Sequence, residues 1–395
     1  MLASRWTILA LLFGVRMSIG LQYQTVGTLS PLFIADFAIG VADIGMLIGL
    51  YHAPGVVLAF PGGALGARLG DMRVAFIGLA LMIAGELMMG LAPAWSLQIA
   101  GRLLAGSGGI LLNVAMAKMV TDWFAGREIA TAMAIFGNAS PFGIALALVA
   151  LPAIAAGDGR ILASLAIVVY LVGSLCALTF LYRAPPQAGP DSSPLSRWPD
   201  PRAASAVVAA GVIYGLYNVS LVAIIGFGPL MLVERGWTIA AASSTTSVVL
   251  WLVALSLPVG GWLADRTGRN STILVGGLLA YAGVLVLSSR VDAVLPAFIL
   301  LGIVSGLPCG PILSLPARVL APETRSVGMG VFFAVYYFLN VSGPWLVGHL
   351  AEMAGRSQIA FDLGAVILCI SGLIWVLFRR LSNHPAAEDC ERSPT

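Results

Sequence analysis

One arginine lies deep inside the first long apolar segment of the chain, with polar neighbours on its own helical face. Arg16 would lie about 15 Å from the start of that segment if the segment is helical, and Tyr23 and Gln24 follow it at helical spacing. A charge at that depth in a membrane costs at least ~2.5 kcal/mol, so it needs a function or a partner. Guanidinium and amide groups are strong hydrogen-bond donors to anions. This stripe therefore predicts an anion-binding site, and the alternative is that Arg16 anchors its helix to main-chain carbonyls.

Glu86 and Arg102 are a second candidate group. A turn is expected near Ala94, and each of the two residues lies eight positions from it. They should therefore lie at similar depth on adjacent antiparallel helices. Opposite charges at the same depth predict a buried ion pair with a structural role. The alternative is that Glu86 carries a proton when Arg102 moves away.

The other polar side chains inside apolar segments are a histidine, amides and phenols. His52 lies in the second segment, where it could carry a proton, contact a substrate or pack as a neutral ring. Buried amides and phenols need hydrogen-bond partners, which a polar substrate, water or a neighbouring helix can supply. Together with Arg16, the predicted substrate-binding residues are Tyr23, Gln24, His52, Asn113, Tyr214, Tyr217, Asn218, Tyr336 and Asn340.

No pattern in the sequence indicates catalysis. The chain has no His, Cys and Asp cluster with metal-ligand spacing, no nucleophile with an adjacent base and no phosphate-binding loop. We therefore expect no metal ion, no cofactor and no enzymatic activity.

The composition is that of a membrane protein. Hydrophobic residues make up 59% of the chain and charged residues 10%, against roughly 25% charge in soluble domains. The net charge of +3 is too small to indicate a nucleic-acid partner. A spanning helix needs about 20 apolar residues. This length predicts an all-α integral membrane protein with twelve transmembrane helices, at residues 6–33, 43–67, 72–92, 96–119, 129–153, 160–182, 203–232, 240–264, 270–289, 294–317, 326–350 and 359–380.

The chain contains two copies of one unit. Gly63 and Arg68 in the first half match Gly261 and Arg266 in the second at a constant offset of half the chain, which indicates an internal duplication within a membrane. A proline-rich segment that cannot form a helix lies between the copies. We expect two pseudo-symmetric six-helix halves at residues 1–182 and 203–380, joined by a cytoplasmic linker at 183–202 and followed by a cytoplasmic tail at 381–395.

Positive charges are distributed unevenly between the two sides of the expected membrane. Of the 21 Lys and Arg residues, Arg160, Arg235, Arg290 and Arg356 are those on the side away from both termini. Positively charged loops are retained in the cytoplasm. The distribution predicts a multi-pass protein of the plasma (inner) membrane with both termini in the cytoplasm.

The duplicated loop resembles the loop signature of the major facilitator superfamily of secondary transporters. The second copy fits the signature fully, whereas the first has Ala67 in place of the acidic residue and Asp71 one turn later. The resemblance implies that these loops gate the cytoplasmic side. It assigns that role to Gly63, Arg68, Asp71 and Arg73 in the first copy, and to Gly261, Asp265, Arg266, Gly268 and Arg269 in the second. Because Ala67 cannot make the acidic contact, we expect the second loop to carry most of the cytoplasmic latch. A further stretch, residues 16–24, resembles members of cyanate and nitroimidazole type.

The resemblance implies secondary active transport by alternating access, with a substrate bound between the halves. Arg16 favours a small organic or inorganic anion as the substrate. The alternative is a proton-coupled exporter of drugs or other hydrophobic compounds, for which Glu86 is the candidate carboxylate. The expected partners are a small-molecule substrate and the lipid bilayer, with a proton as a second candidate solute. We expect a monomer that binds no nucleic acid.

Overall fold

The computed structural model describes residues 4–39, 41–184, 198–237 and 239–382. In these residues every regular element is a helix, and twelve helical segments are long and apolar enough to cross a membrane. The helices are α1 (Arg5–Thr28), α2 (Ser30–Phe37), α3 (Val41–Leu50), α4 (Gly55–Leu69), α5 (Asp71–Leu91), α6 (Trp95–Phe124), α7 (Ile129–Leu181), α8 (Pro201–Glu234), α9 (Ile239–Thr267), α10 (Asn270–Ser288), α11 (Val294–Gly306), α12 (Cys309–Leu313), the 3₁₀ turns η1 (Pro316–Arg318) and η2 (Pro322–Thr324), α13 (Arg325–Ala354) and α14 (Gln358–Ser382). The predicted all-α membrane fold with twelve spans is confirmed.

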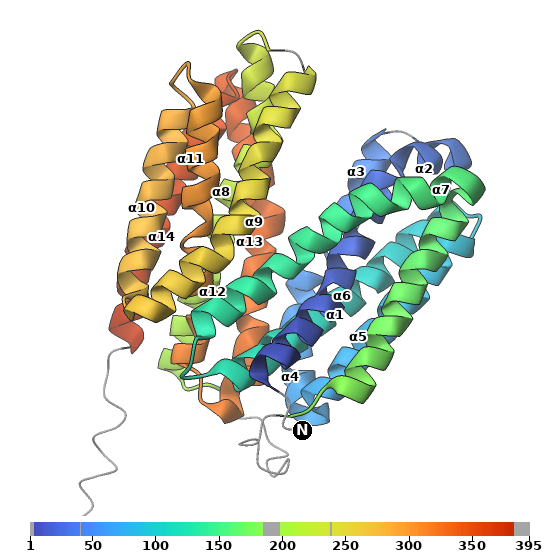
Figure 1. The fold of residues 1–395 in the computed structure, drawn as a ribbon, viewed down its shortest axis with the longest axis horizontal. Coiled ribbons are helices and arrows are strands. Elements are labelled where there is room, and N and C mark those ends of the chain that lie inside the picture. Colours follow the sequence, from blue (N-terminus) through green and yellow to red (C-terminus); the bar gives the residue numbers. More distant parts are fainter. Residues whose placement is uncertain (1–3, 40, 185–197, 238, 383–395) are drawn as a thin grey trace, which may run out of the picture.

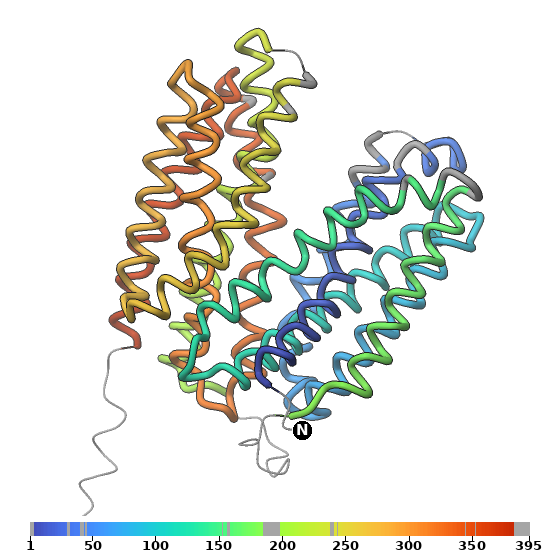
Figure 2. The backbone as a smooth tube through the Cα atoms, viewed as in Figure 1, coloured from blue at the N-terminus to red at the C-terminus, as the bar shows by residue number. Residues whose placement is uncertain are grey.

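The helices form two bundles, α1–α7 and α8–α14. Figure 1 shows that the bundles meet near the N terminus and diverge toward the opposite end. The smooth trace in Figure 2 shows the same separation, with the blue-to-green helices on one side and most of the yellow-to-red helices on the other. We call the end at which the bundles meet the N-terminal end of the molecule.

Several spans are not single straight helices. The second is broken at Tyr51–Pro54, between α3 and α4, and the tenth is broken at Leu307–Pro308, between α11 and α12. Proline cannot donate a main-chain hydrogen bond, so each break coincides with a proline. Conversely, the fifth and sixth spans are both part of α7, which turns back on itself near Gly159, a residue with a φ of +69°.

The seventh span begins earlier than predicted. Pro201, which was expected in the linker, is the first residue of α8, and the carboxylate of Asp200 accepts a hydrogen bond of 3.3 Å from the main-chain N–H of Ala203. An aspartate cap followed by proline is a favoured way to begin a helix. Residues 185–197 of the predicted linker and 383–395 of the predicted tail lie outside the described residues.

Glycines bring the main chains of the two bundles into contact at the N-terminal end. A Cβ on Gly63 of α4 would lie 2.9 Å from the Cα of Gly330 in α13. A Cβ on Gly261 of α9 would lie 2.6 Å from the carbonyl oxygen of Ala130 in α7. These two crossings, which we call the glycine crossings, are equivalent under the sequence duplication. Only glycine permits such close approach of two helices.

Candidate functional site

Arg16 of α1 lies where the two bundles face each other. Its side chain is 8% exposed, one terminal nitrogen donates to the carbonyl of Phe136 in α7, and its Cζ lies 4.1 Å from the centre of the Phe136 ring. Within the described residues its Nε has no partner and no carboxylate pairs with it. The main-chain contact is the one that the anchoring alternative predicted. This hydrogen bond uses only one of the five N–H donors of the guanidinium.

Aromatic rings of the C-terminal bundle face Arg16. Tyr214 of α8 stacks on Tyr336 of α13 with 4.7 Å between ring centres, and Tyr336 contacts Tyr337 at 4.9 Å. The phenols of all three tyrosines are close enough to Arg16 to interact with it electrostatically. Asn340 donates to the hydroxyl of Tyr336 at 3.3 Å. This cluster therefore places phenols and an amide opposite the one buried guanidinium of α1.

The N-terminal bundle contributes its own polar aromatic face. His52 lies in the break of the second span. The centre of its ring is 4.7 Å from the ring centre of Tyr23 and 6.1 Å from that of Tyr337. Asn113 of α6 donates to the hydroxyl of Tyr337 at 3.4 Å, which is a contact between the bundles. We use the name seam cluster for Arg16, Tyr23, His52, Asn113, Tyr214, Tyr336 and Tyr337.

Tyr337 was missed by the sequence reasoning, although it has more contacts across the seam than its neighbour Tyr336. A helical face was assigned through Tyr336 and Asn340, and Tyr337 points about 100° away from that face. The tandem Tyr336–Tyr337 was the available signal, because two adjacent phenols in a membrane helix cannot both face lipid without cost.

Four predicted residues are outside the seam cluster as defined: Asn340, which contacts it through Tyr336, and the three that follow. Tyr217 is 2% exposed and packs edge to face on Tyr281 inside the C-terminal bundle, with 6.1 Å between ring centres. Asn218 donates back to the carbonyl of Tyr214 in its own helix at 2.8 Å. Gln24 is half-buried, and its amide lies beside Gly27 of the same helix. The structure therefore gives them contacts within their own bundle or helix.

The expected ion pair between Glu86 and Arg102 is wrong. Both side chains are fully buried, yet the described residues contain no salt bridge between them. The guanidinium of Arg102 instead donates to three main-chain carbonyls, those of Leu47, Gln22 and Tyr23, at 3.0, 2.9 and 2.7 Å.

The break in the second span explains this arrangement. In an unbroken helix the carbonyl of Leu47 would accept from the main-chain N–H of Tyr51. The N–H of Tyr51 bonds to Ile48 instead, at 3.3 Å, so the Leu47 carbonyl accepts from Arg102. A carbonyl without a donor is costly in a membrane, and an arginine can supply the missing hydrogen bond. Arg102 therefore stabilises a broken helix, and its ring contact with Tyr51, at 4.6 Å, covers the same break.

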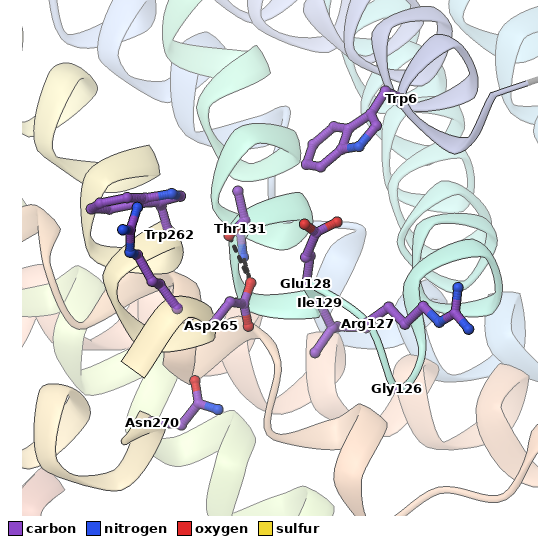
Figure 3. Close-up of a pocket in the computed structure, with 10 residues that line it drawn as sticks. Trp6, Gly126, Arg127, Glu128, Ile129, Thr131, Trp262, Asp265 and Asn270 are labelled. Atoms are coloured by element: carbon purple, nitrogen blue, oxygen red, sulfur yellow. Dashed lines mark hydrogen bonds between the residues drawn. The ribbon is translucent and has the colours of Figure 1, made fainter. Parts of the chain in front are cut away.

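The second copy of the loop signature makes a direct contact between the bundles. Asp265 of α9 accepts hydrogen bonds from the main-chain N–H of Thr131 at 2.7 Å, from its hydroxyl at 2.6 Å, and from the N–H of Ala130 at 3.3 Å. Both residues are in the first turn of α7, where N–H groups have no partner within the helix. Figure 3 shows Asp265 and Thr131 on either side of this contact. A carboxylate of the C-terminal bundle thus caps a helix of the N-terminal bundle.

The same contact forms the wall of a surface groove of about 590 Å³. Its lining, drawn in Figure 3, includes Trp6, Glu128 and Trp262, and so comes from both bundles. Other signature residues are solvent-exposed. The guanidinium of Arg266 lies 5.0 Å from the ring centre of Trp262, Gly268 has a φ of +66°, and Arg269 is exposed.

The first copy of the signature connects to the other bundle through a chain of charges. Asp71 pairs with Lys118 of α6, Lys118 contacts Asp122 at 3.0 Å, and Asp122 pairs with Arg325 of α13 at 2.9 Å. Tyr182 lies beside these charges, and burial raises the pKa of its phenol, with Asp71 adding to the effect. The first half therefore has an ion pair with the C-terminal bundle despite Ala67.

A hydrogen bond accompanies these charges. The hydroxyl of Ser326 in α13 donates to the carbonyl of Gly63 in α4 at 2.6 Å. Arg68 and Arg73, which the loop resemblance also assigned to gating, are exposed at this end. No group of three or more His, Cys, Asp or Glu side chains able to hold a metal ion occurs among the described residues.

The duplicated bundles, the glycine crossings and the loop contacts define a secondary transporter fold. The sequence matches the Major Facilitator Superfamily over residues 12–228 and 203–392. The chain belongs to this superfamily and is a multi-pass membrane protein.

Relatives and solved structures are similar to the chain at low identity. It is 27% identical to the lysosomal dipeptide transporter MFSD1 of Danio rerio over 63% of this chain and 59% of the relative, so the match spans about three fifths of that relative's length. It is 21% identical to the hexuronate transporter of Bacillus subtilis over 92% of both chains. Among solved structures, the transporter FucP in the outward conformation covers 96% of this chain and is itself covered completely, with a TM-score of 0.79 at 14% identity. The human organic anion transporter MFSD10 covers 94% of this chain and is covered over 99% of its own, with a TM-score of 0.68 at 16% identity.

Proposed function

We propose that this protein transports a small organic anion across the membrane, and that the seam cluster binds it. The observation that carries the proposal is Arg16. It is a buried guanidinium between the bundles, its Nε has no partner, and no carboxylate of the described chain neutralises it. A carboxylate of the substrate would supply both the charge and the missing acceptor. The phenols of Tyr336 and Tyr337 and the amide of Asn113 would then bind the polar groups of the substrate body.

Two relatives support a carboxylate substrate. A hexuronate carries a carboxylate on a sugar ring, and a dipeptide carries one at its C terminus. The transporters of these solutes are similar to this chain over 92% and 63% of its length. The resemblance of residues 16–24 to cyanate- and nitroimidazole-type transporters also favours a small substrate.

Alternating access is the proposed mechanism. The bundles, residues 1–182 and 203–380, would rock about the bound anion as two units. Contacts at the N-terminal end correspond to a state closed on that side, which the charge distribution assigns to the cytoplasm. We propose a monomer in the plasma (inner) membrane with both termini cytoplasmic.

Export of a hydrophobic compound is the second candidate function. A relative of this kind is the tetracenomycin C resistance and export protein of Streptomyces glaucescens, 26% identical over 46% of this chain. Export of a cation would need a carboxylate at the seam. Glu86 is fully buried within the N-terminal bundle, where its side chain accepts from Gln22. The position of this carboxylate favours an anionic substrate over a cationic drug.

Thermal unfolding of the purified protein tests the proposal. Ligands that bind only the folded state stabilise it by about 2.7 kcal/mol at a hundredfold excess over Kd. Galacturonate, an N-acetylated dipeptide and benzoate are the anionic probes, and the corresponding neutral amides are their controls. At least one anion should raise the melting temperature of the wild type and of Arg68→Gln, which changes an exposed arginine. The shift should be lost in Arg16→Met and reduced in Arg16→Lys, which keeps the charge but not the fork of donors. An equal shift in Arg16→Met would overturn the proposal.

A further inference from the structure

The main-chain carbonyl of Ala254 in α9 lacks its normal helical partner. In an α-helix this oxygen would accept from the main-chain N–H four residues later. That residue is Pro258, which lies inside α9 and has no N–H. A main-chain carbonyl without a donor is unfavourable wherever water is excluded. Pro258 therefore creates a requirement for a donor from outside the helix.

A side chain of the other bundle supplies that donor. Asn138 of α7 is 3% exposed, and its side-chain nitrogen donates to the Ala254 carbonyl at 2.6 Å. Because a carbonyl can only accept, this bond determines which end of the amide is the nitrogen. Arg102 makes the same kind of contact with the Leu47 carbonyl at the break of the second span. At Asn138, however, the donor and the acceptor belong to different bundles.

This hydrogen bond lies deeper than the loop contact between the same two helices. Asp265 of α9 caps the first turn of α7 at Thr131. Asn138 follows Thr131 by seven residues, which is about 10 Å along the helix axis. Phe136, whose carbonyl accepts from Arg16, is two residues from Asn138. Asn138 therefore joins the bundles at the depth at which Arg16 is held, and not at the surface.

The amide of Asn138 is only partly satisfied in this closed arrangement. Its Oδ1 is buried and has no hydrogen-bond partner within the described residues. A buried acceptor without a donor is unfavourable, and this offsets part of the gain from the bond to Ala254. If the bundles separate at this end, water can reach both ends of the amide and the Ala254 carbonyl. The contact can therefore form and break at a small net change in free energy.

We propose that Asn138 is a reversible inner lock between the bundles, and that Pro258 creates the carbonyl to which it binds. The lock holds the N-terminal end closed from within the membrane, in addition to the contacts at the surface. That it breaks and re-forms during transport rests on the proposed function. The lock and its dependence on Pro258 do not, so the test uses no substrate.

Spin-label distances in the full chain in liposomes test the lock. Labels at Leu181 of α7 and Leu377 of α14, exposed by 61% and 52%, report the separation of the bundles at the N-terminal end. Asn138→Leu should raise the ratio of long to short distances about 2- to 13-fold, as expected for the loss of one hydrogen bond. Asn218→Leu removes an amide that is bonded within its own helix, so this control should leave the ratio unchanged. No change in Asn138→Leu would overturn the lock.

The Pro258→Ala background distinguishes the lock from ordinary packing. The alanine N–H returns a helical donor to the Ala254 carbonyl, so losing Asn138 no longer leaves that carbonyl without a partner. In this background Asn138→Leu should change the ratio by less than about twofold, which is the range of a substitution with no effect of its own. Pro229→Ala, inside α8, is the matched control, because it restores a donor in a different helix. There Asn138→Leu should keep its full effect.

Two further outcomes decide the proposal. An equal effect of Asn138→Leu in the wild type and in the Pro258→Ala background would overturn the role of Pro258. Asn138→Ala, which adds no bulk, should shift the distances in the same direction as Asn138→Leu, and it keeps the test available if the leucine variant does not fold. Failure of anion binding by Arg16, measured separately, would leave these results unaffected.

Discussion

Asp265 of the C-terminal bundle accepts hydrogen bonds from both the main-chain N–H and the hydroxyl of Thr131 in the N-terminal bundle. The duplicated position, Ala67, has no side-chain oxygen with which to cap the first turn of α13. There the contact between the bundles consists of the Asp122–Arg325 ion pair and the Ser326–Gly63 hydrogen bond. The two equivalent junctions of the molecule therefore close by different chemistry, one by helix capping and one by charge pairing.

Removing the cap should open the N-terminal end. Hydrogen bonds to a charged group contribute about 1.5–3 kcal/mol, and a loss of one to two kcal/mol changes a two-state ratio about 5- to 30-fold. Asp265→Asn should therefore shift spin-label distances between Leu181 and Leu377, both exposed at this end, toward longer values. Arg269→Gln, in the same loop, is the matched control. Identical distributions in the two variants would show that the cap does not hold this end closed.

The ion pair at the other junction should act in the same direction and respond to salt. Asp122 and Arg325 are 22% and 11% exposed, so their attraction is only partly screened by solvent. Asp122→Asn should lengthen the same distances, and added salt should reduce the difference from the wild type. Asp71→Asn, which acts on Asp122 through Lys118, should have a smaller effect. A larger opening in Asp71→Asn than in Asp122→Asn would contradict this order.

The glycine crossings should not tolerate a single methyl group. The Cβ of Gly63→Ala would meet main-chain atoms of Ser326 and Gly330, which cannot rotate away as a side chain can. We expect this variant to separate α4 from α13 and to lower the melting temperature. In Gly14→Ala the new Cβ meets no atom within 4 Å, so that variant should unfold at or above the wild-type temperature. Equal melting temperatures for the two variants would show that α4 and α13 can move apart at this crossing without loss of stability.

Arg102 and Glu86 should differ in their effect on stability. Arg102→Met leaves the Leu47 carbonyl without its donor and should cost about 3 kcal/mol. Glu86→Gln keeps the shape and an acceptor for Gln22, so its effect on the free energy of unfolding should be close to zero. Chemical unfolding in detergent micelles measures both. If both variants lost the same large amount of unfolding free energy, Glu86 and Arg102 would have to act as a direct ion pair, contrary to the contacts seen in the structure.

The twelve spans were predictable because a membrane imposes a minimum apolar length on every helix that crosses it. The same length criterion predicted the depth of Arg16 and a similar depth for Glu86 and Arg102. Their partners did not follow. The acceptors of Arg102 are main-chain carbonyls, and one of these is free only because the second span breaks at Tyr51–Pro54. Apolar length does not reveal such a break, because the span stays long and apolar enough to cross the membrane. Pro54 marks the break, but Pro61 lies inside α4 without interrupting it, so proline alone does not locate a break.

Contacts between distant helices were also outside the reach of the sequence. The loop resemblance singled out Asp265, but its partner Thr131 has no special residue type and is identified by its place in the first turn of α7. Tyr337 was missed because a helical face was assigned before the partner helix was known. In each case the deciding quantity is the position of a second main chain, which local spacing does not determine.

The glycine crossings bear on how fast the two ends can open and close. Where side chains interdigitate, two helices separate only after many rotamers rearrange, and that requirement raises the barrier to motion. At Gly63 and Gly261 the surfaces in contact are smooth main chain, and few side chains need to disengage. We therefore expect the glycine crossings to lower the kinetic barrier to separating the bundles, while the directional contacts of Asp265 and Asp122 hold the N-terminal end closed.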